Sequence, residues 1–379
     1  MSYLEHSLKT VPTGWRKLLA LNWSVIVLIT AIASVGFLML YSVSGGRLET
    51  WAEPQMKRFA VGMVMMIAIG MVPIWLWRNV SALAYLVALL LLVAVDLVGV
   101  RGMGAERWLE LGPLRIQPSE LMKISVVMFL AAYYDWLDVD KVSRPLWVFV
   151  PIIFILLPVF LVLRQPDLGT AILLMMGGGV VMFAAGVSLW YFGTVIAMGV
   201  GVIFLVFESR GKDWQLLHDY QFARIDTFLD PMSDPLKDGY NVIQAQIALG
   251  SGGWAGRGFM QGTQSRGNFV PEKHTDFIFT ILAEEFGFVG AVSLLALYTL
   301  VLGFCLYSAL SNKDRYASLL TIGVGATLFL FFSVNMSMVM GLMPVVGVPL
   351  PLVSYGGTAM IILMMAFGLV QSAHVHRPR

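Results

Sequence analysis

The chain has 379 residues, of which 58% are hydrophobic and 13% are charged, and its formal net charge is +2. Soluble domains carry about 25% charged and about 45–50% apolar residues, so this composition indicates an integral membrane protein whose apolar surface faces lipid. The sequence has no basic tract, which argues against a nucleic-acid partner. The single cysteine, Cys305, excludes a disulfide framework within the chain.

Runs of about 20 apolar residues predict transmembrane helices. About ten such spans follow one another, near residues 20–43, 59–77, 80–99, 120–136, 146–163, 168–187, 190–208, 277–309, 317–343 and 358–373. Two long runs divide at Arg78-Asn79 and at Arg164-Gln165-Pro166-Asp167, because each exceeds one bilayer crossing. We therefore expect an all-α polytopic membrane protein, a single domain over residues 1–379, with a large extracytoplasmic loop at 209–276 between helices seven and eight.

An even number of spans places both termini on one side, and the short basic ends favour the cytoplasm. Three segments that can carry functional residues then face outward: residues 101–120, 209–276 and 344–357. Within the long loop, apolar residues recur at helical spacing over 216–229 and over 240–247, which predicts two short amphipathic helices on the membrane surface. Function should lie where the three segments converge.

Asp276 lies at the boundary between a cluster of polar residues and the long apolar run that begins at Phe277. If a helix starts there, Asp276, Thr280 and Glu284 occupy positions i, i+4 and i+8 on one face. Such a polar stripe faces a cavity or another helix rather than lipid. The alternative is that Asp276 caps the helix N-terminus, where aspartate is favoured. The two interpretations are compatible, because a capping carboxylate can still lie in a cleft.

The run at 277–309 is too long for a simple span. As one helix it would measure about 50 Å, against a hydrocarbon core of about 30 Å. We therefore expect it to tilt, to break near Gly287 or Gly290, or to protrude from the bilayer.

A second constellation follows Pro118 and Ser119, which mark a helix start. Glu120 and Lys123 stand at i and i+3 and can form an ion pair, which contributes little on an exposed surface. The run Ile124–Leu130 that follows is apolar, however, and an intramembrane lysine is a functional candidate by default. A lysine held in such surroundings can bind a phosphate.

Two further segments have both structural and functional interpretations. Asp167 is expected to cap the next helix, while Arg164 at the membrane boundary can attract anions. Residues 344–357 contain glycines and prolines that force irregular backbone, which is tolerated at membrane depth only where protein or a cavity covers it. The alternative there is a plain re-entrant turn. The sequence has no GxxxxGK[ST], HExxH or Cys/His cluster, so a P-loop nucleotide site and a zinc site are excluded.

These segments together resemble the SEDS family, the polytopic cell-wall proteins that include RodA and FtsW. The likeness covers nearly the whole chain in order, and two pieces, Gly262-Thr263-Gln264 and Leu282-Ala283-Glu284-Glu285, look more like RodA, the elongation member, than FtsW, the division member. The other matching pieces are Arg107-Trp108, Gln117-Pro118-Ser119-Glu120 with Lys123, Gln165-Pro166-Asp167-Leu168-Gly169-Thr170, Tyr220-Gln221 with Arg224, Gly250-Ser251-Gly252-Gly253, Pro271-Glu272, His274-Thr275-Asp276-Phe277-Ile278-Phe279 and the stretch from Gly347 to Gly357.

The resemblance implies a peptidoglycan glycosyltransferase that polymerises lipid II during cell elongation, in the bacterial cytoplasmic (inner) membrane. It also implies a class B penicillin-binding protein as the transpeptidase partner, within the elongation machinery. The family's catalytic aspartate maps onto Asp276. The substrate-binding candidates are Arg107, Glu120, Lys123, Asp167, Arg224, His274, Thr275 and Ser354.

That chemistry is compatible with these residue types. A sugar hydroxyl that attacks an anomeric carbon needs a general base, and an aspartate is ionised at neutral pH. Diphosphate is a good leaving group, so one carboxylate suffices where a glycosidase needs two. Lys123, Arg107 and Arg224 are candidates to stabilise the developing negative charge, with a divalent ion, magnesium or manganese, as a further candidate. No nucleotide cofactor is expected.

Two other functions fit the same sequence. A lipid II flippase would also have many helices and intramembrane charges, but it needs a polar path that reaches both membrane faces. A non-catalytic scaffold for a transpeptidase would need neither Asp276 nor Lys123.

Overall fold

A computed structural model describes residues 14–102, 105–111, 114–212, 214–216, 219–233, 238–267, 269 and 272–377. Ten helices of at least 17 residues lie in these ranges, and each overlaps one predicted span. They are α2 (Trp23–Val43), α3 (Ala52–Met71), α4 (Ile74–Val98), α5 (Pro118–Trp136), α6 (Pro145–Arg164), α7 (Leu168–Ala184), α8 (Leu189–Ser209), α12 (Ile278–Leu310), α13 (Arg315–Val339) and α14 (Thr358–Val375). Seven of them are long and apolar enough to cross a membrane, so the chain is a multi-pass membrane protein.

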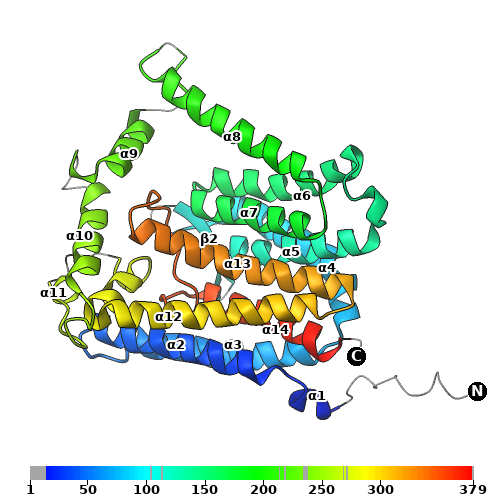
Figure 1. The fold of residues 1–379 in the computed structure, drawn as a ribbon, viewed down its shortest axis with the longest axis horizontal. Coiled ribbons are helices and arrows are strands. Elements are labelled where there is room, and N and C mark those ends of the chain that lie inside the picture. The colour runs from blue at the N-terminus through cyan, green and yellow to red at the C-terminus, as the bar shows by residue number, and fades with distance from the viewer. Residues whose placement is uncertain are drawn as a thin grey trace, which may run out of the picture.

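The helices form one bundle with two distinct ends (Figure 1). Helix α14 packs against α3, α4 against α5, and α12 against α13 and α2. The short helices α9 (Asp219–Leu229), α10 (Asp238–Ser251) and α11 (Thr263–Arg266) gather at one end, called here the loop end. The short α1 (Arg16–Leu19) and the last turn of α14 lie at the opposite end, called here the terminal end, as an even number of spans requires.

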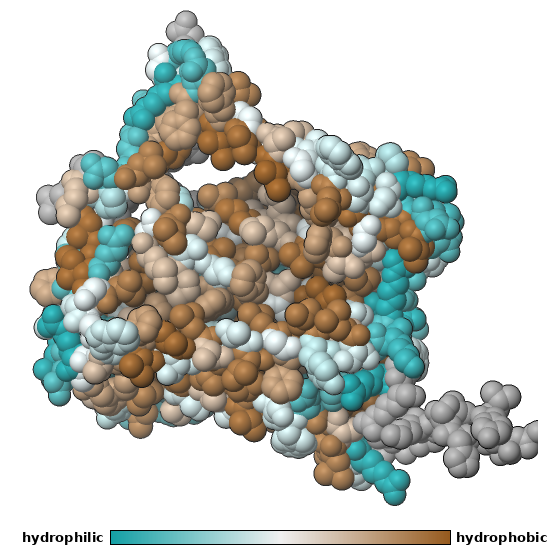
Figure 2. Space-filling model, in the orientation of Figure 1, coloured by the Kyte–Doolittle hydropathy of each residue, from teal (hydrophilic) through white to brown (hydrophobic). Residues whose placement is uncertain are grey.

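The surface between the two ends is apolar. Figure 2 shows mainly brown, hydrophobic residues across the middle of the face and teal, hydrophilic ones toward its edges. Helix α8 stands apart from the other long helices, and none of its most apolar stretch is buried inside the protein. An apolar helix with no protein cover is stable only in lipid, so this band marks the membrane-facing belt.

The predicted all-α class needs one correction. Three short strands, β1 (Val100–Gly102), β2 (Ala105–Leu111) and β3 (Leu114–Ile116), pair antiparallel in the order β1-β2-β3. Polar residues, Arg101, Glu106, Arg107, Glu110 and Arg115 among them, interrupt the apolar pattern along these strands, so the segment lacks the continuous apolar run of a transmembrane helix. Because this segment leaves the apolar belt, its backbone pairs with itself rather than forming a helix.

One of the two predicted hinges is wrong and the other is confirmed. The chain bends at Val72-Pro73 rather than at Arg78-Asn79, because the residue before a proline is driven into extended backbone (Val72 ψ 135°). Arg78 lies inside α4 instead. The second hinge lies where it is expected, since α6 ends at Arg164 and α7 begins at Leu168.

The long apolar run that begins at residue 277 contains a kink, which is one of the three outcomes expected from its length. Gly287 inside α12 has φ 65° and ψ −160°, a conformation that favours glycine. The loop at 252–258 occupies the break: Arg257 N and Gly258 N donate to the carbonyls of residues 284 and 285, while Phe288 N and Val289 N donate to those of residues 253 and 254. The kink therefore joins the large loop to α12 through backbone hydrogen bonds.

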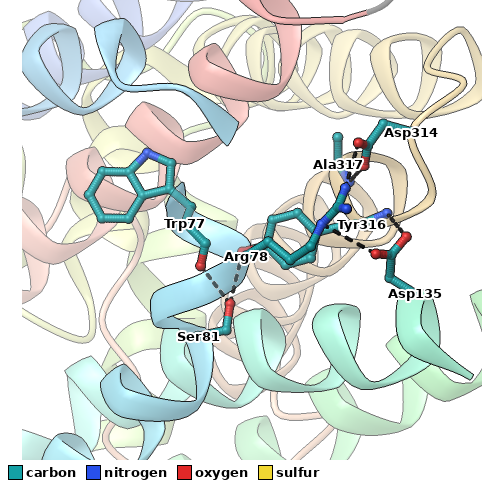
Figure 3. Close-up of polar contacts among 7 residues, drawn as sticks. All are labelled: Trp77, Arg78, Ser81, Asp135, Asp314, Tyr316 and Ala317. Carbon is teal, nitrogen blue, oxygen red and sulfur yellow. Dashed lines mark hydrogen bonds and ion pairs between the residues drawn. The ribbon is translucent and has the colours of Figure 1, made fainter. Parts of the chain in front are cut away.

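A cluster of charged side chains ties the helices together at the terminal end (Figure 3). Arg78 of α4 lies between two carboxylates, with Nη2 2.6 Å from Asp314 and Nε 3.2 Å from Asp135. Asp314 caps α13, and Asp135 accepts a hydrogen bond from Tyr316 N. The cluster thus satisfies its own charges and fixes α4, α5 and α13 to one another.

Candidate functional site

Asp276 sits at the end of a short turn that precedes α12. Thr275 N and Phe277 N both donate to the Glu272 carbonyl, at 3.2 and 3.3 Å. Thr275 Oγ1 donates to the Glu272 carboxylate at 3.1 Å. This turn fixes the backbone on both sides of Asp276 before the helix begins at Ile278.

The irregular segment at 344–357 lies directly against this turn. Ser354 Oγ donates to the Thr275 carbonyl at 2.6 Å, and Tyr355 N donates to the His274 carbonyl at 2.9 Å. Asn335 of α13 donates through Nδ2 to the carbonyls of Asp276 and Val348, at 2.8 and 2.7 Å. Both irregular segments are thereby satisfied internally, which is the condition for such backbone at membrane depth.

The Asp276 carboxylate faces the glycine of this segment. A Cβ on Gly347 would lie 3.7 Å from Asp276 Oδ2, and Gly347 itself has φ 70°. Within the described residues the carboxylate accepts no hydrogen bond, and the N-cap of α12 is Phe277, so the capping interpretation of Asp276 is wrong. Burial, with the nearby Glu272 charge, raises the pKa of Asp276 to about 6.

Glu120 and Lys123 form a buried ion pair, with Lys123 Nζ 2.7 Å from Glu120 Oε1. Lys123 also lies over the ring of Phe331, 3.9 Å from its centroid. Both charged residues line a cleft, and Ser354 lines the same cleft. Ser354 therefore connects the two predicted groups, because it faces the lysine cleft and also bonds the turn that carries Asp276.

Arg107 and Asp167 meet near this segment but have structural partners. Arg107 Nε donates to the Gln165 carbonyl at 3.1 Å, and its Nη1 lies 3.8 Å from Asp167. Asp167 caps α7 by accepting from Thr170 N and Thr170 Oγ1, at 3.1 and 3.0 Å, which confirms the capping interpretation. A Cβ on Gly169 would lie 2.7 Å from the carbonyl oxygen of Val346, so this helix start packs on the 344–357 segment.

The remaining predicted residues divide between the site and its surroundings. His274 belongs to the Asp276 turn, and burial lowers the pKa of its ring. Thr280 and Glu284, the predicted stripe, are fully buried in α12, and Glu284 accepts hydrogen bonds from Thr263 Oγ1 and Gln264 N. They face protein rather than the cleft. The side chain of Arg224 lies outside the described residues.

The start of α3 forms a wall of the site that the sequence did not reveal. Trp51 stacks on His274 with ring centroids 4.2 Å apart, and Gln55 Nε2 donates to the Ser354 carbonyl at 3.0 Å. Arg58 donates to the Tyr355 hydroxyl at 3.1 Å. Their spacing of i, i+4 and i+7 is the sequence signal that would place them on one helix face. Charged residues interrupt this stretch, however, and it was expected to lie outside the span at 59–77.

The fold and the site define a polytopic membrane protein with a mainly apolar cleft, which holds a buried Glu-Lys ion pair, and a partly buried carboxylate nearby at its loop end. A model of the FtsW/RodA/SpoVE family, described as cell cycle protein, matches residues 22–379, so the chain belongs to this family. Peptidoglycan glycosyltransferase MrdB of Escherichia coli is 40% identical over 365 residues, covering 96% of each chain. Stage V sporulation protein E of Bacillus subtilis is 33% identical, covering 91% of this chain and 94% of that one.

Solved structures agree with this family. Rod shape determining protein RodA of Thermus thermophilus is similar with a TM-score of 0.71 at 28% identity, covering 95% of this chain and 99% of that one. A chain in a structure described as "Structural coordination of polymerization and crosslinking by a peptidoglycan synthase complex" has a TM-score of 0.80 at 31% identity, covering 94% of this chain and 98% of that one. The RodA-like fold expected from the sequence is confirmed.

Proposed function

We propose that this chain is a peptidoglycan glycosyltransferase that polymerises lipid II, with Asp276 as the general base. Relatives named peptidoglycan glycosyltransferase align along almost its full length, which supports the activity. The observation that carries the residue assignment is the Asp276 carboxylate, which lies against Gly347, accepts no hydrogen bond from the described residues, and has its pKa raised to about 6 by partial burial and the Glu272 charge. A base of that pKa is ionised at neutral pH and takes a proton more readily than an ordinary aspartate.

The reaction forms a bond between an acceptor sugar oxygen and the anomeric carbon of a lipid-linked donor. Asp276 takes the hydroxyl proton as that bond forms, and the bond from the anomeric carbon to the polyprenyl diphosphate breaks. Glu272 and Thr275 hold the Asp276 backbone in place during this step. Direct displacement of the diphosphate inverts the anomeric centre.

Lys123 is the cation we assign to the diphosphate. It is buried beside an apolar cleft, where a positive charge acts over a short distance with little screening. Its partner Glu120 keeps the lysine ordered before substrate arrives. The attraction between Lys123 Nζ and the phosphate then becomes stronger in the transition state, because negative charge moves onto the leaving oxygen.

A divalent ion is compatible with part of the site. Among the described residues, no group of three or more His, Cys, Asp or Glu side chains suits a metal. Glu272 and Asp276 are two carboxylates close enough to interact, so magnesium or manganese fits here only if the diphosphate supplies further oxygens. When bound, the ion supplies charge neutralisation of the diphosphate.

The distribution of polar groups favours polymerisation over lipid II transport. Toward the terminal end, the cavity next to the lysine cleft is lined almost entirely by apolar side chains, Ile69, Trp77 and Leu369 among them. The charged cluster beyond it, around Arg78, is paired internally (Figure 3). Along the described residues these features do not supply the polar path to both faces that a flippase needs.

We further assign the loop end to the outside of the bacterial cytoplasmic (inner) membrane, with both termini in the cytoplasm. The partner that fits is a class B penicillin-binding protein within the elongation machinery. The similarity to a chain from a complex described by polymerization and crosslinking supports a crosslinking partner.

Incubation of the purified full chain with lipid II tests the activity. We expect glycan polymer from the natural chain, and none from Asp276→Asn although its thermal unfolding remains cooperative. Polymer from Asp276→Asn at the normal rate would reject the base. Movement of lipid II across liposomes without polymer would instead support the flippase, and neither activity would support the scaffold.

A further inference from the structure

Arg58 is a cation with an unsatisfied donor beside the site. Its Nη2 donates to the Tyr355 hydroxyl, and its guanidinium carbon lies 4.7 Å from the centroid of that ring. Its Nη1 is buried and has no hydrogen-bond partner, and no carboxylate among the described residues pairs with it. A buried N–H without an acceptor is costly, so this geometry favours an anionic ligand that supplies one.

Two of the predicted cations, Lys123 and Arg107, already have protein partners. Lys123 forms its ion pair with Glu120, and Arg107 donates to two backbone carbonyls beside Asp167. Arg58 differs from both, because its charge is not balanced by an acid within the described residues. A partly buried charge that no protein acid balances points to an anion that arrives with the substrate.

Arg58 belongs to a wall that faces the reacting groups. Trp51, Gln55 and Arg58 lie on one face of α3, and each contacts the site: Trp51 the ring of His274, Gln55 the carbonyl of Ser354, Arg58 the side chain of Tyr355. Gln55 also lines the cleft that holds Lys123. Arg58 is therefore adjacent to the cleft, on the α3 wall, whereas Lys123 comes from α5.

From this geometry we propose that Arg58 binds the diphosphate of a lipid-linked substrate at a subsite separate from Lys123. The proposal rests on the proposed function, in which donor and acceptor both carry a polyprenyl diphosphate. Two such groups repel each other unless each has its own cation. An arginine suits this task, because its planar guanidinium can give two parallel hydrogen bonds to phosphate oxygens.

The aromatic cluster gives this subsite its rigidity. Trp51 meets the ring of Tyr355 edge-on at 4.8 Å and stacks on His274. Tyr355 N is itself bonded to the His274 carbonyl, two residues before Asp276. A phosphate on Arg58 is thus held at a fixed place relative to the base, which is what orientation of two substrates requires.

The test measures binding of geranylgeranyl diphosphate, a short polyprenyl diphosphate, to the purified full chain carrying Asp276→Asn, so that binding is read without turnover. Adding Arg58→Gln should weaken binding about tenfold or more, as loss of a charge-assisted hydrogen bond does. Adding Arg58→Lys should weaken it less. The matched control is Lys57→Gln, since Lys57 is the neighbouring cation, is exposed and pairs with Glu53.

In the active chain, Arg58→Gln should raise KM for lipid II more than it lowers kcat. Unchanged diphosphate affinity with a lower unfolding temperature would make Arg58 only a support for Tyr355 and overturn the proposal. Displacement of the probe by phosphatidylglycerol or by inorganic phosphate at similar concentrations would also overturn it, because the site would then take any phosphate. If Arg58→Gln fails to fold, the diphosphate affinity of Arg58→Lys tests the proposal, because that variant keeps the charge and loses the planar pair of donors. Failure of the natural chain to make polymer would reject the proposed function, while the binding result would still report on Arg58.

Discussion

Replacement of Asp276 by asparagine should stabilise the fold while it removes activity. Asp276 is partly buried, accepts no hydrogen bond among the described residues and has Glu272 nearby, so its charged form is disfavoured in the folded protein. Asparagine has nearly the same shape and carries no charge. It therefore removes the unfavourable charge and breaks no contact that the carboxylate makes.

The size of the effect follows from the pKa. The pKa rises from 3.8 to about 6, which is about two units. Each unit corresponds to 1.36 kcal/mol, so the charged carboxylate destabilises the fold by about 3 kcal/mol. Because the folded pKa is the higher one, this cost is present in full above pH 6 and disappears as the pH falls toward 4.

Thermal unfolding in detergent, followed by intrinsic fluorescence, measures this. At pH 8 Asp276→Asn should unfold a few degrees above the natural chain, and the difference should shrink toward pH 4. Asp138→Asn is the control, since Asp138 is an exposed aspartate whose pKa is lowered by its pairing with Lys141. If Asp276→Asn unfolds at or below the natural temperature across this pH range, the burial argument for the base is wrong.

Three other outcomes are expected. Polymerisation, measured as kcat/KM for lipid II, should fall as the pH drops through about 6, because protonated Asp276 cannot accept a proton; a flat profile from pH 8 to 5 would contradict this. Arg78→Ala should lower stability by roughly 1–3 kcal/mol, because two carboxylates lose their shared partner at the terminal end; unchanged thermal unfolding would show that the ion pairs contribute nothing. Gly287→Ala should lower the unfolding temperature more than Gly303→Ala, which meets no atom within 4 Å, since the Gly287 Cβ would lie 2.3 Å from a loop nitrogen; equal effects would contradict the tight kink.

The helices were predictable because the bilayer sets their length. All ten apolar runs became helices, and the amphipathic patterns at 216–229 and 240–247 became α9 and α10. The errors have local causes. The charge of Arg78 suggested a break there, yet the chain bends before Pro73. Asp135 and Asp314, the acids that pair with Arg78 inside α4, are distant from it in sequence.

The site was predictable where its residues are neighbours in sequence. The buried pair of Glu120 and Lys123 follows from spacing and apolar surroundings, and the structure contains it. The partner of Arg58 lies 297 residues away at Tyr355, so no local pattern could connect them. Whether Asp276 caps its helix depended on a local turn that the sequence pattern did not reveal, in which Thr275 N and Phe277 N bond the Glu272 carbonyl and the cap position falls on Phe277.

The loop at 252–258 is joined to the kink of α12 by backbone hydrogen bonds, so two distant parts of the chain are held together without a disulfide. Backbone bonds between residues 253–258 and 284–289 close the intervening segment, which contains Asp276, into a ring. Many proteins exposed outside the cytoplasm close such a ring with a disulfide, which reduces the freedom of the unfolded loop. Here Cys305 is the single cysteine, so the ring is insensitive to reduction. The geometry around Asp276 should therefore persist equally under oxidising and reducing conditions.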